Sequence, residues 1–189
     1  QATALAAVGM QAASTRNAAG TGNVLKQTKY MVFSIPNFAE ERSAYDNASH
    51  QVLLSASSNK DGNCAMYLGT VPEDLGTSVD LAAKFKFELS NNDTAAHSYV
   101  IVMSSIADSA NADGSYGNMS NEVAMTFAGD AAGVSGNLET VGWTTLTGWK
   151  SAMTAGNGLA MAVCRSGDTD ASTVDSYTNS LSIRYGSVQ

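Results

Sequence analysis

Three aspartates, Asp168, Asp170 and Asp175, follow Arg165 in the segment 165–186, whose sequence is RSGDTDASTVDSYTNSLSIRYG. Carboxylates that converge on one point can bind a hard cation such as Ca²⁺, and an arginine beside one of them can form an ion pair. The same residues are also typical of a solvated bend with Asx-turns between two strands. We favour the bend, with one modest ion pair to Arg165, and keep the three aspartates as an alternative metal site.

A second acidic loop, ADSANADGSYGN, contains Asp108, Asn111 and Asp113. It is superficially similar to a calcium-binding loop, but the first and last ligand positions would be Ser109 and Ser120 instead of Asp and Glu. Turn formation explains Asp-Gly dipeptides without a metal. We therefore expect no cofactor, with Ca²⁺ at either acidic segment as the alternative.

The residues of common catalytic sites are present but do not form a recognisable pattern. His50 and His97 have no nucleophile motif nearby, and G-x-S-x-G does not occur. The acidic residues fall mainly in expected loops, which disfavours a pair of glycosidase carboxylates. Two cysteines and two histidines do not form a recognisable zinc ligand set. The sequence predicts a protein that is not an enzyme.

The two cysteines, Cys64 and Cys164, each lie in an apolar run, NCAMYLG and LAMAVCRS. We favour two buried free thiols on strands. A disulfide is the alternative, because spacing alone cannot place the two Cα atoms within bridging range.

The two tryptophans are six positions apart across an expected turn. Trp143 lies in VGWTT and is expected in the core. Trp149 is expected at a rim, where an exposed indole would contact a sugar or another subunit.

Composition limits the partners of this chain of 189 residues, of which 44% are hydrophobic and 14% charged. The charged fraction is well below the roughly 25% of ordinary soluble domains, and small uncharged polar residues take the place of the missing charges. The net charge of −7, without a basic run, argues against nucleic acid as a partner. No apolar stretch approaches the roughly 18 residues that span a membrane.

About nine β-branched or alternating segments, separated by turn residues, predict strands and almost no helix. The segment 79–90 is the clearest, because apolar and charged residues alternate through AAKFKFEL. The segment 147–158 fits one helical turn ending at Gly156. The strands are expected at 29–35, 51–57, 63–71, 79–90, 97–105, 122–128, 138–147, 158–165 and 179–185. This pattern favours an all-β fold, an antiparallel β-sandwich of jelly-roll type, over an immunoglobulin-like sandwich, which lacks its tyrosine corner and its Cys–Trp–Cys spacing here.

Residues 1–28 are rich in alanine and are expected to form an N-terminal arm before a sandwich domain at 29–189. Leu5 and Val8 have helix-like spacing, but Gly9 weakens that face. An arm without a core of its own becomes ordered only by packing on its domain or on a neighbouring subunit. The candidate subunit or capsid contacts are Leu5, Val8, Met10 and Trp149.

The part of the chain from about 70 to 186 resembles the small all-β virion structural proteins of tailed bacteriophages, of the decoration, head-fibre or tail-associated type. The resemblance lies in VPEDLGTSVDLAAKFKFELS, in HSYVIVMSS, and in the stretch from TLTGWKSAM through the Asp-rich loop to LSIRYG. It implies a jelly-roll-like sandwich, usually trimeric and attached to the virion, and it brings no catalytic residues.

The resulting expectation is a non-enzymatic capsid decoration or cement protein on the exterior of a phage virion. Its expected partners are its own copies, as a homotrimer, and other virion proteins, with neither nucleic acid nor a membrane. The alternative is a carbohydrate- or receptor-binding module of a tail or head fibre, with a glycan as ligand.

Overall fold

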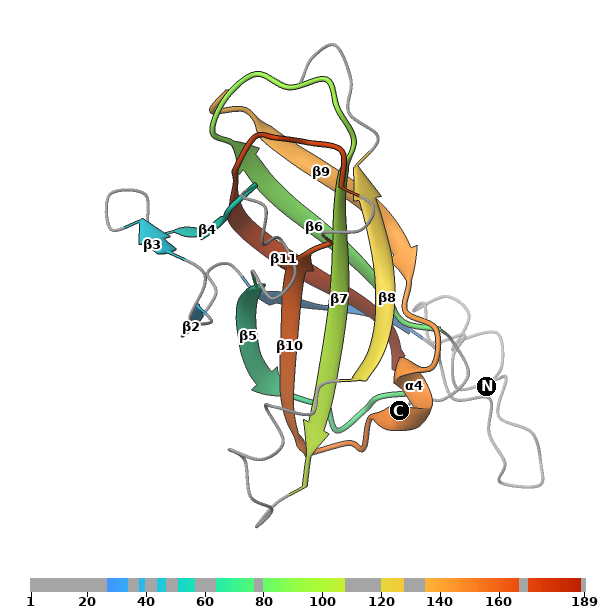
Figure 1. Cartoon of the computed structure of the whole chain (residues 1–189). Coiled ribbons are helices and arrows are strands. Elements are labelled where there is room, and N and C mark those ends of the chain that lie inside the picture. The colour runs from blue at the N-terminus through green and yellow to red at the C-terminus, as the bar shows by residue number, and fades with distance from the viewer. Residues whose placement is uncertain are drawn as a thin grey trace, which may run out of the picture.

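A computed structural model describes residues 27–33, 38–39, 44–46, 51–56, 64–76, 80–107, 120–127, 135–166 and 170–187. The described chain forms strands and one helical turn (Figure 1). Its elements are β1 (Gln27–Phe33), β2 (Phe38–Ala39), β3 (Ala44–Asp46), β4 (Gln51–Leu54), β5 (Cys64–Thr70), β6 (Ala82–Leu89), β7 (His97–Ile106), β8 (Ser120–Phe127), β9 (Leu138–Thr145), α4 (Trp149–Ala152), β10 (Gly158–Arg165) and β11 (Ser176–Ser187).

The strands form two antiparallel sheets that pack face to face. One sheet has the order β3-β4-β11-β6-β9, with β1 also paired to β11, and the other has the order β2-β5-β10-β7-β8. The pairings are nested along the chain: β7 with β8, β6 with β9, β5 with β10, and β4 with β11. Eight strands nested in this way and split between two sheets form a jelly roll, so the predicted fold class is confirmed.

The core lies between the two sheets and follows the period of two in each strand. In β6 the apolar residues point inward and the charged residues point outward. The inward residues are Ala83, Phe85, Phe87 and Leu89, and the outward residues are Lys84, Lys86 and Glu88. An aromatic cluster joins the sheets, because the ring of Tyr99 on β7 lies 5.1 Å from Phe85 and 5.2 Å from Phe87. Burial of each such side chain contributes about 1.5–3 kcal/mol to folding.

The helical turn α4 closes one end of the sandwich. Gly148 precedes it with φ of 82°, a left-handed conformation that other residues rarely adopt. The chain can therefore turn sharply, and Trp149 enters the core beside Leu146 and Met153. The expected helical turn is present, but it ends at Ala152 and not at Gly156.

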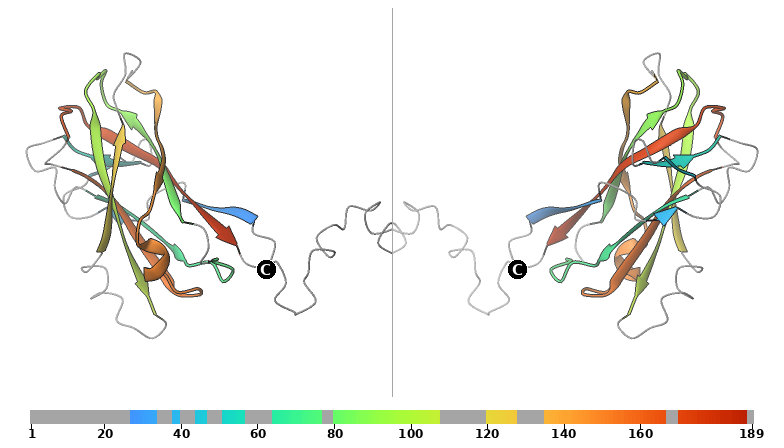
Figure 2. Two further views of the ribbon diagram at one scale, coloured as in Figure 1. Left: turned by 90° about the vertical axis from the view of Figure 1, so that its right-hand side faces the viewer. Right: turned by 90° about the vertical axis from the view of Figure 1, so that its left-hand side faces the viewer.

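Strand β1 extends the larger sheet at one margin of the molecule, beside the C-terminal part of β11 (Figure 2). Met31 and Phe33 point inward, and Phe33 lies over Gly69, where a Cβ would come within 2.8 Å of its ring. Lys29 forms an ion pair with Asp74, which also accepts a hydrogen bond from the Tyr185 hydroxyl. These contacts anchor β1 to the sandwich. The residues predicted to form the arm before Gln27 lie outside the described residues.

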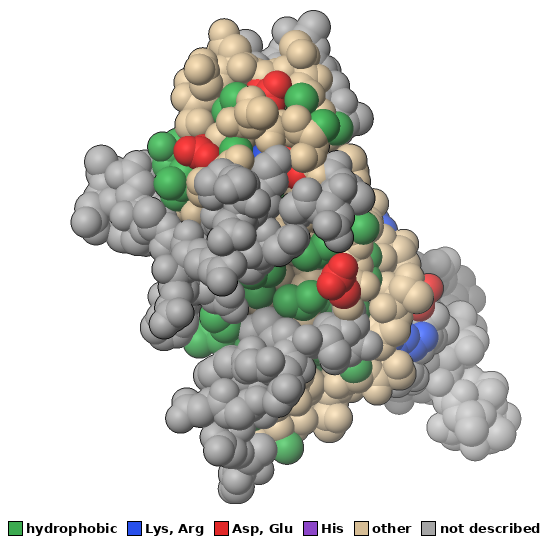
Figure 3. Space-filling view, viewed as in Figure 1, with side chains coloured by type: hydrophobic (Ala, Val, Ile, Leu, Met, Phe, Trp, Pro, Cys, Tyr) green, Lys and Arg blue, Asp and Glu red, His purple; other side chains and the backbone are tan. Residues whose placement is uncertain are grey.

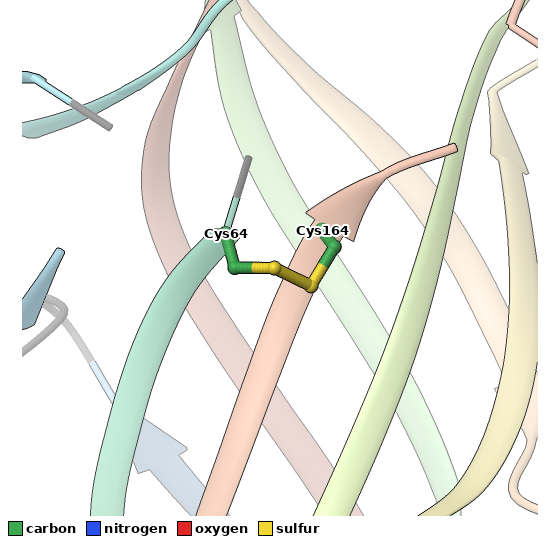
Figure 4. Close-up of a disulfide and its surroundings, with 2 residues drawn as sticks. All are labelled: Cys64 and Cys164. Atoms are coloured by element: carbon green, nitrogen blue, oxygen red, sulfur yellow. A yellow bond between two sulfur atoms is a disulfide. The ribbon is translucent and has the colours of Figure 1, made fainter. Parts of the chain in front are cut away.

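Cys64 and Cys164 form a disulfide between β5 and β10 (Figure 4). The expectation of two free thiols is wrong. The reason is the strand register, which places the two residues directly opposite each other, with their Cα atoms 3.9 Å apart. The bond lies on the outer face of the five-stranded sheet, against Met66, Val100 and Val102.

Candidate functional site

The outer face of the six-stranded sheet carries exposed aromatic rings beside basic side chains. We call Tyr30, Lys84, Trp143 and Arg184 the platform; they come from β1, β6, β9 and β11, respectively. Tyr30 is 57% exposed and Trp143 is 39% exposed. Large apolar side chains exposed together on a protein surface often mark a contact or ligand site.

A β-bulge explains why Trp143 points outward, contrary to the expectation that it is in the core. Ala83 of β6 lies opposite Thr144 of β9, but Phe85 lies opposite Val141, so β9 contains one extra residue at this point. An extra residue reverses the alternation of side chains, which places Trp143 on the outer face. Gly142 was the available signal, since a glycine inside a strand often marks a bulge.

The platform is held together by contacts to the Trp143 ring. The guanidinium carbon of Arg184 lies 4.9 Å from the ring centroid, and Nζ of Lys84 lies 6.0 Å from it. The ring of Tyr30 lies 5.9 Å away at a tilt of 43°. Cation–π contacts at exposed sites contribute about 0.5–1 kcal/mol each, so the basic side chains are held over the Trp143 ring. Arg184 lies between the inward Ile183 and Tyr185, as the period of two of a strand requires.

Trp149, the residue expected at a rim, is fully buried in the core. The expectation was wrong because the left-handed Gly148 turns the chain inward immediately before it. Trp149 therefore offers no surface to a sugar or a second subunit.

The described part of the Asp-rich segment, residues 170–175, is only partly the solvated bend that was expected, because Asp170 and Ser172 are buried while Ala171 and Thr173 are exposed. The Arg165 guanidinium is buried and forms an ion pair with Asp170, which is buried as well. Arg165 also donates hydrogen bonds to the carbonyl oxygens of Val174, at 2.9 Å, and Leu54, at 3.3 Å. The expected ion pair to Arg165 thus exists. Together with these two hydrogen bonds, it joins the end of β10 to the segment before β11 and to β4.

A second buried polar group surrounds His97 at the start of β7. Nε2 of His97 lies 3.3 Å from Oδ2 of Asp93, without the geometry of a hydrogen bond, and Asp93 accepts a hydrogen bond from the Ser172 hydroxyl. Burial lowers the pKa of His97, and Arg165 lowers it further, whereas Asp170 and Asp93 oppose the shift. Burial by itself raises the pKa of Asp93, but hydrogen bonds from Ser172 and from the Ala95 amide bring it below its usual value.

This group lacks the arrangement of a catalytic triad. Ser172 is fully buried and its hydroxyl is bonded to Asp93, not to His97. A nucleophile must reach its substrate and must be hydrogen-bonded to its base. The group therefore serves to hold the loops before β7 and before β11 together.

The described aspartates of the candidate metal set have separate partners. Asp170 pairs with Arg165, and Oδ1 of Asp175 accepts a hydrogen bond from the Ala56 amide. The part of the chain that the structure describes contains no group of three His, Cys, Asp or Glu residues that could hold a metal ion. The other candidates lie outside the described residues, namely Asp108, Asn111, Asp113 and Asp168 for a metal and Leu5, Val8 and Met10 for subunit contacts.

Among the described residues, no helix has the length and hydropathy needed to cross a membrane.

Comparison with known proteins gives no family. No family model and no curated protein sequence matches the chain. The solved structures with a similar arrangement include an isomalto-dextranase of Arthrobacter globiformis T6 complexed with panose, with 17% identity, a TM-score of 0.47, and coverage of 82% of this chain and 23% of that chain. They also include a family two carbohydrate esterase from Cellvibrio japonicus, with 8% identity, a TM-score of 0.39, and coverage of 87% and 36%.

A viral capsid protein is also among these structures. The VP2 subviral particle of infectious bursal disease virus is 10% identical, with a TM-score of 0.35 and coverage of 84% of this chain and 33% of that chain. The chain spans well under half the length of each of these three proteins. At these scores the likeness is one of β-sandwich architecture and assigns no function.

Proposed function

We propose that this protein is a non-enzymatic structural component of a virion, a decoration or cement protein on the exterior of a phage head. It acts through contacts with its own copies, as a homotrimer, and with other virion proteins. It requires no cofactor, and neither nucleic acid nor a membrane is its partner. The jelly-roll fold, the low content of charged residues and the pattern resemblance of residues 70–186 support this proposal.

The observation that carries the proposal is the outer side of β1. Tyr30 and Val32 are 57% and 62% exposed, and among the described residues β1 pairs with β11 alone. An unpaired sheet edge is a template for pairing with another chain, and proteins usually protect such edges with charges, proline or bulges. β1, with the sequence QTKYMVF, carries only Lys29 as a charge, and that side chain is paired with Asp74.

A strand of a neighbouring copy can pair with this edge, and its side chains can cover Tyr30 and Val32. Main-chain hydrogen bonds then supply affinity, and the covered side chains supply specificity. The arm predicted at 1–28 ends in the first residues of β1, so it would leave the domain at this contact.

Sedimentation velocity tests the proposal. We expect the unaltered protein to sediment as a trimer and the double variant Tyr30→Ser/Val32→Ser to shift to monomer, because the substitutions remove the apolar part of the contact. Leu138→Ser is the matched control, since Leu138 is 46% exposed on β9 of the same sheet. A monomeric unaltered protein at high concentration, or a double variant that remains trimeric, would contradict the proposal.

A second candidate function is a carbohydrate- or receptor-binding module. It is favoured by the exposed Trp143 beside Tyr30, because flat aromatic faces stack on sugar rings. A glycan array on which the protein finds no ligand would count against it.

A further inference from the structure

The basic residues of the platform, together with the neighbouring Lys86, stand out on an acidic protein. The chain has a net charge of −7 with ten Lys and Arg residues, yet three of these, Lys84, Lys86 and Arg184, lie on the outer face of β6 and β11. On the opposite face, formed by β5, β10, β7 and β8, few of the described side chains that are visible are Lys or Arg (Figure 3). Of the six Lys and Arg residues that the structure describes, three therefore lie on this one face of the sandwich.

These basic side chains are also available for a ligand. The other described basic residues with an ion pair, Lys29 and Arg165, are bonded to Asp74 and Asp170. No described carboxylate lies within ion-pair distance of Lys84, Lys86 or Arg184. Glu88, the outward acidic residue of β6, follows Lys86 two positions on and bounds the basic area at that end.

The aromatic rings and the cations face the same side and define a kind of ligand. Arg184 lies over the Trp143 ring, and a guanidinium held against a ring keeps its N–H donors free at its edge, where they match a carboxylate. The exposed parts of the Trp143 and Tyr30 rings offer apolar surface for the C–H face of a sugar. A ligand that combines neutral sugar rings with widely spaced carboxylates fits this arrangement.

We propose that the platform binds an acidic polysaccharide in which uronates alternate with neutral sugars. This inference rests on the second candidate function and specifies its ligand. A sugar ring stacks on Trp143 and Tyr30, while a uronate carboxylate accepts hydrogen bonds from Arg184 and is attracted by Lys84 and Lys86. Single-stranded nucleic acid is also anionic and stacks on aromatic rings, but its closely spaced charges are repelled by the net negative charge of the protein.

Isothermal titration with a hyaluronan octasaccharide tests the inference, with dextran of similar size as the neutral comparison. We expect binding to hyaluronan that weakens as salt rises, and little binding to dextran. Arg184→Gln removes the charge with little change in size and should weaken binding about tenfold. Trp143→Ala should weaken it at least as much. Lys150→Gln, which removes a positive charge from α4, should have no effect.

The outcomes separate the inference from the functions on which it rests. Equal binding of dextran and hyaluronan, unaffected by Arg184→Gln, would overturn the acidic ligand but leave a carbohydrate-binding module. Absence of binding to either saccharide would overturn both, and tighter binding of an oligothymidine would replace the saccharide with nucleic acid. Equal losses in Arg184→Gln and Lys150→Gln would show general charge attraction and overturn the site. Thermal unfolding of each variant verifies the fold, and the trimer is tested independently through Val32→Ser alone, because Tyr30 also belongs to the platform.

Discussion

Arg165 is a buried cation at the end of β10, and its partners hold the segment before β11 against the core. Its guanidinium is bonded to Asp170 and to two main-chain carbonyl oxygens, and it lies 5.9 Å from the ring centroid of Tyr99. A buried ion pair contributes little net stability compared with apolar packing, but removal of one partner leaves the other charge uncompensated. Arg165 therefore matters most for the position of the C-terminal segment.

Replacement of Arg165 by Met should lower the free energy of unfolding by about 3–5 kcal/mol, because the buried Asp170 loses its counter-charge. Urea unfolding measures this loss. Arg184→Met is the matched control on the neighbouring sheet and should cost about 1 kcal/mol or less, since it loses only an exposed cation–π contact. Similar losses in both variants would show that the Arg165 ion pair has no special role.

His97 should make the protein less stable as the pH falls from about 7 to 5. Its pKa is lowered in the folded state by burial and by Arg165, so the unfolded chain binds a proton that the folded chain does not. Stability is then lost as the pH falls below the unfolded value of about 6.5, with a slope of at most about 1.4 kcal/mol per pH unit. Asp93, whose pKa is also lowered, acts only near pH 4 and below.

Urea unfolding at several pH values measures this effect, with His97→Gln as the comparison. The variant should show a flatter dependence between pH 7 and 5, whatever its stability at pH 7. An identical slope in the two proteins would assign the dependence to other groups.

At the scale of elements, the pairing of strands decides which side chains meet. β5 and β10 are antiparallel neighbours in a register that places Cys64 opposite Cys164, although the two residues are 100 positions apart in the chain. Between β6 and β9, one extra residue turns Trp143 outward and creates the platform. Both features depend on a shift of a single residue, because a slip of one position moves every side chain to the other face.

Reduction of the Cys64–Cys164 disulfide should lower the free energy of unfolding by about 2–4 kcal/mol, because the bond closes a long loop in the unfolded chain. Urea unfolding with and without a phosphine reductant measures the change. The double variant Cys64→Ser/Cys164→Ser should be as unstable as the reduced protein and indifferent to the reductant. A protein with two free thiols, or stability unaffected by the reductant, would contradict this.

At the scale of the whole molecule, the core of the sandwich is built from residues that come from nearly the entire described chain. Its core includes residues from β1, where Met31 and Phe33 pack on it, to Tyr185 of β11. β1, at the start of the domain, and β4, the first of the eight nested strands, both pair with β11 at the end of the domain. The domain therefore folds as one cooperative unit with β1 as its outermost part.

Removal of residues 1–25 should leave the fold intact and reduce attachment to a particle. The remaining chain keeps β1 and its ion pair to Asp74, so thermal unfolding should occur within about 2 °C of that of the full chain. Binding to virions that lack the protein measures attachment. Undiminished decoration by the shortened chain would contradict the role of the arm, and a large loss of thermal stability would assign the arm to the fold itself.

The sequence by itself determined the strands and the class of fold. Alternating segments such as AAKFKFEL and the turn residues between them are local signals, so β1 and all eight jelly-roll strands could be predicted close to their observed positions. Leu181, Ile183 and Tyr185, which alternate within the predicted strand 179–185, are all buried, in keeping with the same period of two.

Only the tertiary structure decided which residues meet. The disulfide, the buried ion pair of Arg165 and Asp170, and the platform each join residues from different strands or loops. The two tryptophans are reversed from expectation, with Trp143 exposed and Trp149 buried, because each depends on one local backbone irregularity. The physical reason is that the period of two fixes which residues of a strand share a face. The register between strands, the bulge in β9 and the turn at Gly148 decide what lies opposite that face.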